Sequence, residues 1–566
     1  MSSAIAARPD QIDPTDWNEL APLYQVLIDR PLRCAGCLEQ LILDRSELDA
    51  RVNEAEANLF IAMTCHTDDA AAQSAYTRFV ERVEPELRRA GFALDRRIAE
   101  SPFRGDLDQE RFGVLLRDTG VDVALYREAN LAIQTELTTL DQEYSQIVGA
   151  MTISVDGTER TIPQMVGELE RTDRSIREAA WRAIFERRYA DHERIDQIFS
   201  RMVALRNRMA QNADEADFRD FQHRKLRRFD YTPADCGTFH HAAETVCVPL
   251  MRALDRERAA TLGLERLRPW DLAVDVHGRA PLRPFTTAEE LVAGTSRIFH
   301  RLRPSLGGLF DELRGGGCLD LESRKGKAPG GYQYQRQWSR TPFIFMNAVG
   351  LHRDLITMVH EAGHAFHSLL SRDEPLLHYR NSPMEFAEVA SMSMELLTLG
   401  VLEEFYAAPE AERARRTLLE ELPGKLAWIA QIDSFQHWIY THPEHSTAER
   451  EAEWLSLETR FGRELDWSGF ESWQRSSWQR QLHLFGVPFY YIEYGIAQLG
   501  ALQLWGQFRR DPAAALDHYE AGLSLGGSKP LPRLFEATGL RFDFGAAIVR
   551  ELLAEVAKEL GVGRQG

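Results

Sequence analysis

Two histidines and a glutamate within one short apolar stretch could form a metal-dependent hydrolytic centre. They are His360, Glu361 and His364, in the sequence LITMVHEAGHAFHSLL of residues 355–370. On a helix, the two histidines project from one face, one turn apart, so their imidazoles can share one tetrahedral ion. Glu361 is the natural general base, which would take a proton from zinc-bound water and later deliver it to the leaving amine. The surrounding apolar residues predict a buried helix, where polar groups require a compensating partner such as a metal.

A third ligand should come from another segment, and NSPMEFAEVASMSMELLTLG offers Glu385, Glu388 and Glu395. Glu388 is followed by the small residues Val-Ala-Ser, which would allow its helix to approach the first one closely. Glu395 lies seven residues later on the same helical face, so it could hydrogen-bond the ring nitrogen of a ligand histidine that does not bind the metal. We therefore predict that Glu388 is the third ligand and that Glu395 is the hydrogen-bond partner of a ligand histidine. The alternative is that all three are solvated helix charges.

The chain resembles the thimet oligopeptidase and oligoendopeptidase F family of zinc peptidases. The resemblance is carried by VHEAGHAFHSLL, by the downstream FAEVASMSMEL, and by the upstream RKGKAPGGYQYQRQWSRTPFIFMN. It runs from about Tyr189 to the C-terminus, whereas the N-terminal part matches only in being helical. In that family the third ligand is the glutamate at the place of Glu388, which agrees with the choice above. The angiotensin-converting-enzyme type has a similar spacing, and spacing alone does not exclude it.

Hydrolysis also needs a hydrogen-bond donor for the oxyanion, besides the metal. The segment HLFGVPFYYIEYGIAQ supplies His483, Tyr490, Tyr491 and Tyr494, of which Tyr490 and Tyr494 would share a helical face. The resemblance implies a histidine and one or more tyrosines in such a segment. We predict His483 and Tyr494 for this role, then Tyr490, and we expect Tyr491 to pack in the core. The tyrosine spacing departs from that of the thimet oligopeptidase branch.

Four further residues are predicted to contact the substrate: Gly331, Phe343, Phe345 and His367. The stretch Pro342–Asn347 is expected to be an edge strand whose free backbone groups could pair with an extended peptide. The resemblance supports this expectation, because family members hold substrate against such a strand. His367 lies on the same helical face as His360, where it could line the cleft or simply be packed. The neighbouring GKAPGGY lacks the order of a phosphate-binding loop.

The elements that must position these residues are mostly helices. Most of the sequence carries the 3.6-residue period of an amphipathic helix, as in Ile548–Val556, with Gly561 where a helix C-cap belongs. Strand patterns are few: a hairpin turning at Asp156-Gly157, and two short strands within Tyr332–Asn347. We therefore predict an all-α fold with small β insertions near the active site.

The length of 566 residues predicts more than one compact part. We place a soft boundary near residue 210, which gives an N-terminal helical lobe over residues 1–210 and a catalytic lobe over residues 211–566. The resemblance implies two helical lobes around a deep channel that would admit short unfolded peptides and exclude folded proteins. Deep channels of this kind generally require some gating motion.

Composition excludes several other classes of function. A net charge of −19 is unsuited to nucleic acid, where binding depends on lysine and arginine. No run of about 18 apolar residues predicts a membrane span, and the N-terminus lacks the pattern of a secretory signal. Six cysteines in so long a chain do not form a disulfide framework. We expect a cytoplasmic protein, and its oligomeric state stays open.

Together these residues predict a zinc endopeptidase with one Zn²⁺ per chain, held by His360, His364 and Glu388, that cleaves short unstructured oligopeptides. An exopeptidase of the dipeptidyl-carboxypeptidase type on the same scaffold is the first alternative. A catalytically silent peptide-binding relative is the second. Two imidazoles and one carboxylate also suit cobalt or manganese, although availability and geometry favour zinc.

Overall fold

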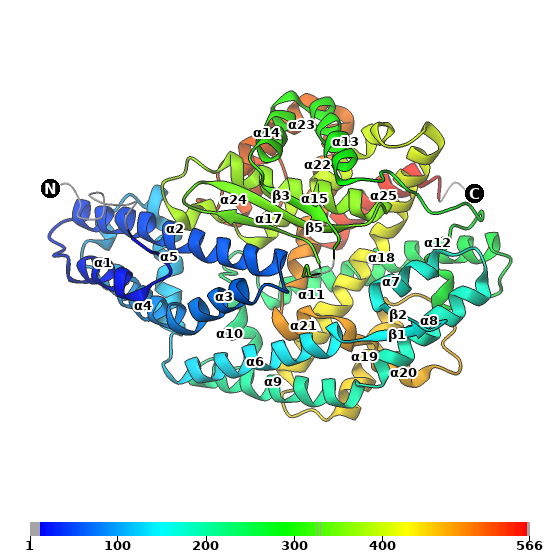
Figure 1. Ribbon diagram of the computed structural model, residues 1–566, viewed down its shortest axis with the longest axis horizontal. Coiled ribbons are helices and arrows are strands. Elements are labelled where there is room, and N and C mark those ends of the chain that lie inside the picture. The colour runs from blue at the N-terminus through cyan, green and yellow to red at the C-terminus, as the bar shows by residue number, and fades with distance from the viewer. Residues whose placement is uncertain (1–11, 325, 329, 563–566) are drawn as a thin grey trace. The chain divides into compact units, whose positions relative to one another are not determined.

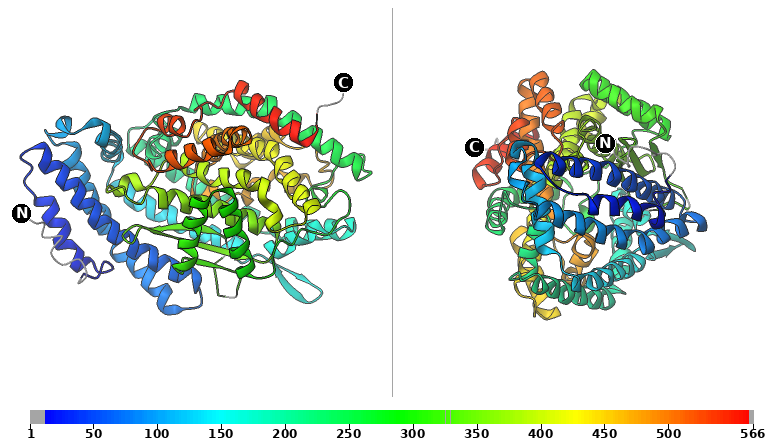
Figure 2. Two further views of the ribbon diagram at one scale, coloured as in Figure 1. Left: turned by 90° about the horizontal axis from the view of Figure 1, so that it is seen from above. Right: turned by 90° about the vertical axis from the view of Figure 1, so that its left-hand side faces the viewer.

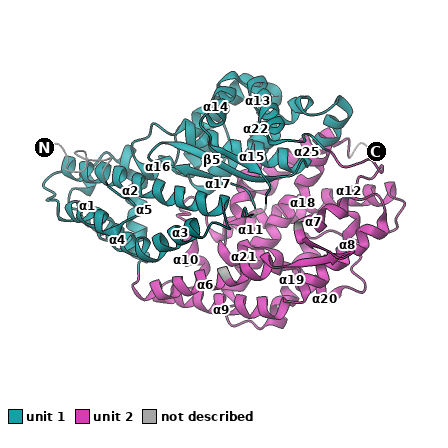
Figure 3. Ribbon diagram, in the orientation of Figure 1, with its two compact units in different colours: residues 1–126, 283–414, 500–542 teal, residues 127–282, 415–499, 543–566 magenta. Residues whose placement is uncertain are grey.

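A computed structural model describes residues 12–324, 326–328 and 330–562, and these residues are mainly helical, as predicted. They form two compact units, each built from three separate segments of the chain (Figure 3). Unit 1 comprises residues 1–126, 283–414 and 500–542, and unit 2 comprises residues 127–282, 415–499 and 543–566. Within the described residues, no helix is both long and apolar enough to span a membrane.

Unit 1 begins with five helices that lie side by side (Figures 1 and 2). Tyr24, Leu41, Phe79 and Phe112 are buried together in their shared core. The helices of this unit are α1 (Trp17–Asp29), α2 (Ala35–Cys65), α3 (Ala70–Arg82), α4 (Glu84–Ala99), α5 (Gln109–Leu125), α13 (Ala288–Leu302), α14 (Pro304–Gly315), α15 (His352–Leu370), α16 (Leu377–Arg380), α17 (Met384–Leu397), α23 (Pro512–Leu523) and α24 (Leu531–Ala537).

Unit 1 also contains a three-stranded sheet of β3 (Leu319–Glu322), β4 (Tyr332–Arg336) and β5 (Thr341–Ala348). The strand order is β3-β5-β4, with β5 parallel to β3 and antiparallel to β4. Two strands within Tyr332–Asn347 are thus confirmed. The prediction that Pro342–Asn347 is an edge strand is wrong, because β3 and β4 occupy both sides of β5. The edges of this sheet, among the described residues, are β3 and β4.

In the part of unit 2 that the structure describes, the hairpin of β1 (Thr152–Val155) and β2 (Thr158–Thr161) is the only sheet, and the other elements are helices. Asp156 and Gly157 both have positive φ, which confirms the predicted two-residue turn. Its helices are α6 (Ala129–Gly149), α7 (Ile162–Val166), α8 (Arg174–Tyr189), α9 (His192–Asn212), α10 (Phe218–Lys225), α11 (Pro233–Ala242), α12 (Val248–Thr261), α19 (Thr447–Phe461), α20 (Glu471–Arg475), α21 (His483–Gly486) and α25 (Ala546–Leu560), which Gly561 caps in the left-handed conformation as predicted.

Two helices contain boundaries between the units: α18 (Ala408–Thr441) and α22 (Tyr491–Arg510). The fold also contains short helices, which are η2 (Arg104–Asp106), η3 (Gly167–Glu170), η4 (Ala243–Cys247, a π-helix), η5 (Pro269–Asp271), η6 (Thr398–Glu404) and η7 (Ser477–Arg480). The boundary expected near residue 210 falls inside α9 and does not coincide with these units. Because each unit is assembled from distant segments, a change in composition along the chain does not mark its limits.

Candidate active site

Helices α15 and α17 pack directly against each other in unit 1 (Figure 1). Gly363 permits this contact: a Cβ at this position would lie 2.6 Å from both the carbonyl oxygen of Ala390 and the Cα of Ser391. Both of these atoms belong to the backbone of α17, so neither could rotate away. The same Ala390 carbonyl oxygen accepts a hydrogen bond from the hydroxyl of Tyr519 in α23 at 3.0 Å. The position of α17 relative to α15 is therefore tightly defined.

The start of α15 is fixed by Asp354. Its carboxylate accepts hydrogen bonds from the backbone N–H groups of Val349 and Leu351, at 2.8 and 2.9 Å. These bonds satisfy backbone donors that precede the helix and join the end of β5 to α15. Gly350, with φ of 86°, makes the turn between them; a Cβ there would approach the Phe285 carbonyl oxygen to 2.9 Å. The end of β5 and the start of α15 are thereby held in fixed positions relative to each other.

This packing brings His360, His364 and Glu388 together, with one donor atom from each within 4.8 Å of the other two. The Oε2 atom of Glu388 lies 3.5 Å from Nε2 of His360 and 3.8 Å from Nε2 of His364. Two ligands of a tetrahedral zinc ion, each about 2.05 Å from the metal, are separated by about 3.3 Å. The three side chains are thus close to the spacing that one small divalent ion requires.

Further polar contacts orient two of these three side chains. Nδ1 of His360 lies 2.6 Å from Oε1 of Glu395, so Nε2 is the nitrogen that faces Glu388. The hydroxyl of Ser391, which is fully buried, donates to Oε2 of Glu388 at 3.0 Å. Carboxylates behind a ligand histidine fix its tautomer and raise its basicity. Glu395 was expected in this position from the sequence, whereas Ser391 was noticed only as a small residue.

The site carries more acidic than basic groups. Burial opposes protonation of His360, but the hydrogen bond and charge of Glu395 raise the pKa of His360 to about 9. Burial lowers the pKa of His364 to about 4, despite the nearby charge of Glu388. With Glu361, three carboxyl groups surround two imidazoles. A divalent cation would neutralise this buried excess of negative charge.

Glu361 is buried next to His360, on the side of α15 that faces β4. Burial raises the pKa of Glu361 to about 7, although His360 and a hydrogen bond from the backbone N–H of Gln333 act in the opposite direction. A carboxyl group with a pKa near neutrality can both accept and return a proton at physiological pH. Gln333 belongs to β4, and its side chain also reaches Ser368 in α15 at 3.4 Å. The edge strand β4 therefore runs beside Glu361.

The predicted substrate-contacting residues differ in their surroundings. Phe345 has no exposed surface and stacks on Tyr332, so in this arrangement it belongs to the core between the sheet and α2. Phe343 is also buried in this cluster. His367 is buried and packs edge-to-face against Phe386, with its ring centroid 5.6 Å away. Burial lowers the pKa of His367 to about 3, so it is a neutral packed histidine. Gly331 immediately precedes β4.

The predicted oxyanion residues lie in unit 2, where His483 is surrounded by tyrosines. The centroid of its ring lies 5.0 Å from that of Tyr491, 5.8 Å from that of Tyr490 and 5.9 Å from that of Tyr494. The rings of Tyr490 and Tyr494 are 5.0 Å apart. All four side chains are partly exposed, so solvent reaches this cluster. Gln481 Nε2 contacts Nδ1 of His483 at 2.7 Å and holds the imidazole in place.

Comparison with known proteins gives a consistent result. Residues 169–553 match peptidase family M3. The chain is 28% identical over 220 residues to the oligopeptidase PepF of Bacillus subtilis, which covers 37% of this chain and 32% of that protein. It is 30% identical over 132 residues to the chromosomal oligoendopeptidase F of Lactococcus lactis subsp. cremoris, covering 23% of this chain and 21% of that one. These matches thus span between about a fifth and a third of the curated relatives.

Solved structures match over nearly the whole chain. PZ peptidase A, determined with an inhibitor, has a TM-score of 0.91 and 26% identity, covering 97% of this chain and 98% of that one. A structure assigned to oligoendopeptidase F has a TM-score of 0.91 and 27% identity, covering 98% of both chains. The likeness therefore includes the N-terminal helices, which the sequence could align only as helical.

Proposed function

This chain belongs to peptidase family M3, and on that premise we propose that it is a zinc-dependent endopeptidase acting on short, unstructured oligopeptides. The observation that carries the proposal is the convergence of His360, His364 and Glu388 beside the buried Glu361. Two imidazoles and a carboxylate are the ligands of many hydrolytic zinc sites, which keep a fourth position open. A metal bound there would supply a Lewis acid for the scissile carbonyl and would acidify water.

Within this proposal, Glu361 is the general base and then the general acid. Its carboxylate removes a proton from the attacking water, and the same carboxyl group then delivers that proton to the leaving amine. The raised pKa of about 7 supports both steps, because the group changes its protonation readily near neutral pH. Glu395 acts through His360, which it holds with one nitrogen turned toward Glu388.

We assign the binding of the developing oxyanion to His483 and Tyr494, with Tyr490 as a third donor. The support is their mutual clustering and partial exposure, together with donor groups suited to a negatively charged oxygen. The Tyr491 hydroxyl is hydrogen-bonded to Trp428 and Gln481, and burial is the main cause of its raised pKa. Tyr491 is therefore not assigned to the oxyanion, and its replacement serves as a control for that of Tyr494. Preorganised donors of this kind typically contribute about 10²–10³-fold to turnover.

We further propose that the substrate backbone pairs with β4, which is an edge strand, and not with β5. The backbone N–H of Gln333 in β4 lies within hydrogen-bonding reach of Glu361, so a peptide extended along this edge would pass the general base. Gly331, immediately before β4, remains a proposed contact. Phe343 and Phe345 lie on the central strand β5, directly across from Tyr334 and Tyr332 of β4.

We also place the protein in a reducing compartment such as the cytoplasm. All six cysteines lie within the described residues, and none of them forms a disulfide bond. This is the cysteine chemistry expected of a chain that folds in a reducing environment.

The test is cleavage of a series of unstructured peptides, from about five to thirty residues, with and without a metal chelator, with products read by mass spectrometry. The proposal predicts internal cuts in the short peptides that chelation abolishes and zinc restores. Release of terminal dipeptides alone would replace the endopeptidase with an exopeptidase. Chelator-insensitive cleavage, or none after zinc is supplied, would overturn the proposal.

A further inference from the structure

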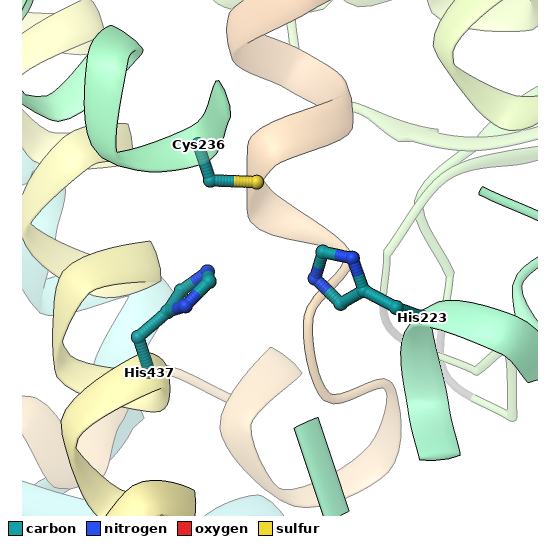
Figure 4. Close-up of side chains that lie close together, drawn as sticks. All are labelled: His223, Cys236 and His437. Atoms are coloured by element: carbon teal, nitrogen blue, oxygen red, sulfur yellow. The ribbon is translucent and has the colours of Figure 1, made fainter. Parts of the chain in front are cut away.

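A second group of potential metal ligands lies in unit 2 and consists of residues not used above. His223 on α10, Cys236 on α11 and His437 on α18 each offer one donor atom, and these three atoms lie within 4.8 Å of one another. Figure 4 shows the Cys236 sulfur and the two imidazole rings turned toward a common space. Cys236 is fully buried and His223 nearly so. Two consecutive helices and the distant α18 thus contribute one ligand each.

Several polar atoms in this cluster lack the partners that buried groups normally have. Nδ1 of His223 has no hydrogen-bond partner among the described residues, nor has Oδ1 of Asp433, which has no exposed surface. An unpaired buried polar atom destabilises the folded protein, because it has lost its hydrogen bonds to water. Such atoms therefore call for an explanation, and a bound ion is one of the ordinary ones.

Asp433 is placed to support His437 as a ligand. Its Oδ2 atom lies 2.7 Å from Nε2 of His240 and 3.3 Å from Nε2 of His437. When one nitrogen of an imidazole faces a carboxylate, the other nitrogen is left with its lone pair for a metal. The contact of Asp433 with His437 is looser than that of Glu395 with His360 in unit 1, which is a hydrogen bond of 2.6 Å, because Nε2 of His437 has no hydrogen-bond partner among the described residues. Asp433 thus lies next to one of the three potential ligands without being one of them.

The charges of the cluster also balance. A Cys236 thiolate and the Asp433 carboxylate together neutralise a divalent cation, while both imidazoles bind in the neutral form. Burial, together with the neighbouring Arg228, lowers the pKa of His223 to about 2, so this ring is neutral. The guanidinium of Arg228 is itself paired with Glu493 at 2.8 Å.

Binding through Nδ1 would place the ring proton of His223 on Nε2. The contact of 3.3 Å between that atom and Nη1 of Arg228 would then lengthen.

We propose that His223, Cys236 and His437 form a second metal site, for a borderline or soft divalent cation such as zinc. One sulfur and two imidazole nitrogens favour zinc, cobalt or copper over magnesium and calcium, which prefer oxygen ligands. A tetrahedral zinc ion separates nitrogen ligands by about 3.3 Å, so the side chains close by about an ångström when the ion binds. The ion ties α10, α11 and α18 together.

Cobalt(II) distinguishes this site from the one at His360. A thiolate gives cobalt an intense near-ultraviolet charge-transfer absorption, whereas imidazole and carboxylate ligands do not. The exposed Cys34 and the partly buried Cys37, whose sulfur atoms are 2.9 Å apart, could bind cobalt themselves, so both are replaced by serine in every sample. The proposal predicts two cobalt ions per chain and a thiolate band.

Two variants assign the band. Cys236→Ser should abolish it and leave one cobalt per chain, whereas Cys247→Ser should leave both the band and two ions. Cys247 is the matched control, because it is equally buried in unit 2 and belongs to no ligand group among the described residues. His360→Ala should lose one ion but keep the band, which separates this inference from the proposed catalytic site.

If Cys236→Ser does not fold, the spectrum and metal content of the chain that keeps Cys236 decide the matter. One cobalt per chain without a thiolate band, measured on folded protein after full metal loading, would overturn the proposal. A band that survives in a folded Cys236→Ser variant would do the same.

Discussion

Replacing Gly363 by alanine should separate the two helices that form the proposed metal site. An added Cβ would lie 2.6 Å from backbone atoms of Ala390 and Ser391, whereas ordinary contacts begin near 3.4 Å. Helix α17 must therefore retreat by about 0.8 Å, the difference between these distances. Glu388, on the same helix, would move away from both histidines, from which it is now separated by 3.5 and 3.8 Å.

The expected cost has two parts. Overpacking of a well-packed core typically costs about 1–3 kcal/mol of unfolding free energy. Displacement of a ligand should weaken metal binding by at least the 10- to 100-fold seen when outer hydrogen-bond partners of metal ligands are lost. Urea unfolding measures the first part, and competition with a chelator of known affinity measures the second.

Gly308→Ala is the matched control, since Gly308 lies on the exposed surface of α14 with no atom within 4 Å of an added Cβ. It should stabilise the protein by up to about 1 kcal/mol, because alanine favours the helix. If Gly363→Ala bound metal and resisted urea like the wild type, the close approach of α15 and α17 would not control the site.

Three further predictions concern other contacts. Glu395→Gln should weaken metal binding about 10-fold, because His360 loses a charged partner at 2.6 Å, and an unchanged dissociation constant would show that Glu395 does not tune the ligand. Tyr494→Phe should lower kcat about 10²-fold or more with metal content unchanged, whereas Tyr491→Phe should have little effect, and equal losses would reject the assignment. Burial raises the pKa of Glu458 to about 7, above its unfolded value, so its ionisation removes stability as the pH rises from about 4.5 through 7. Glu458→Gln should therefore raise the unfolding free energy at pH 8 by about 3 kcal/mol, measured by urea unfolding, and leave it nearly unchanged at pH 4.5; the same gain at both pH values would contradict this reasoning.

The sequence allowed the histidine helix to be predicted because its information is local. The four-residue spacing of His360 and His364 and the seven-residue spacing of Glu388 and Glu395 each lie within one helix. Gly363 between the histidines is itself a local indication of close helix packing. The hairpin at Asp156-Gly157 and the C-cap at Gly561 were equally local.

Other features depend on segments that are distant in sequence. Pro342–Asn347 was mispredicted as an edge strand because β3, with only four residues, gave no strand pattern strong enough to place it beside β5. The cluster of His223, Cys236 and His437 draws on residues more than 200 positions apart, and only the folded unit brings them together. The units themselves are discontinuous, so no linear boundary defines them.

The central claim is tested most directly by metal content and turnover of Glu361→Gln, measured on the same samples as the wild type and a surface variant, Glu410→Gln. Our account predicts that Glu361→Gln binds as much zinc at the His360 site as the wild type. Its cleavage of an unstructured peptide should fall by about 10²–10⁴-fold, the typical contribution of a general base. Glu410→Gln should match the wild type in both respects. Near-normal turnover of Glu361→Gln would contradict the account.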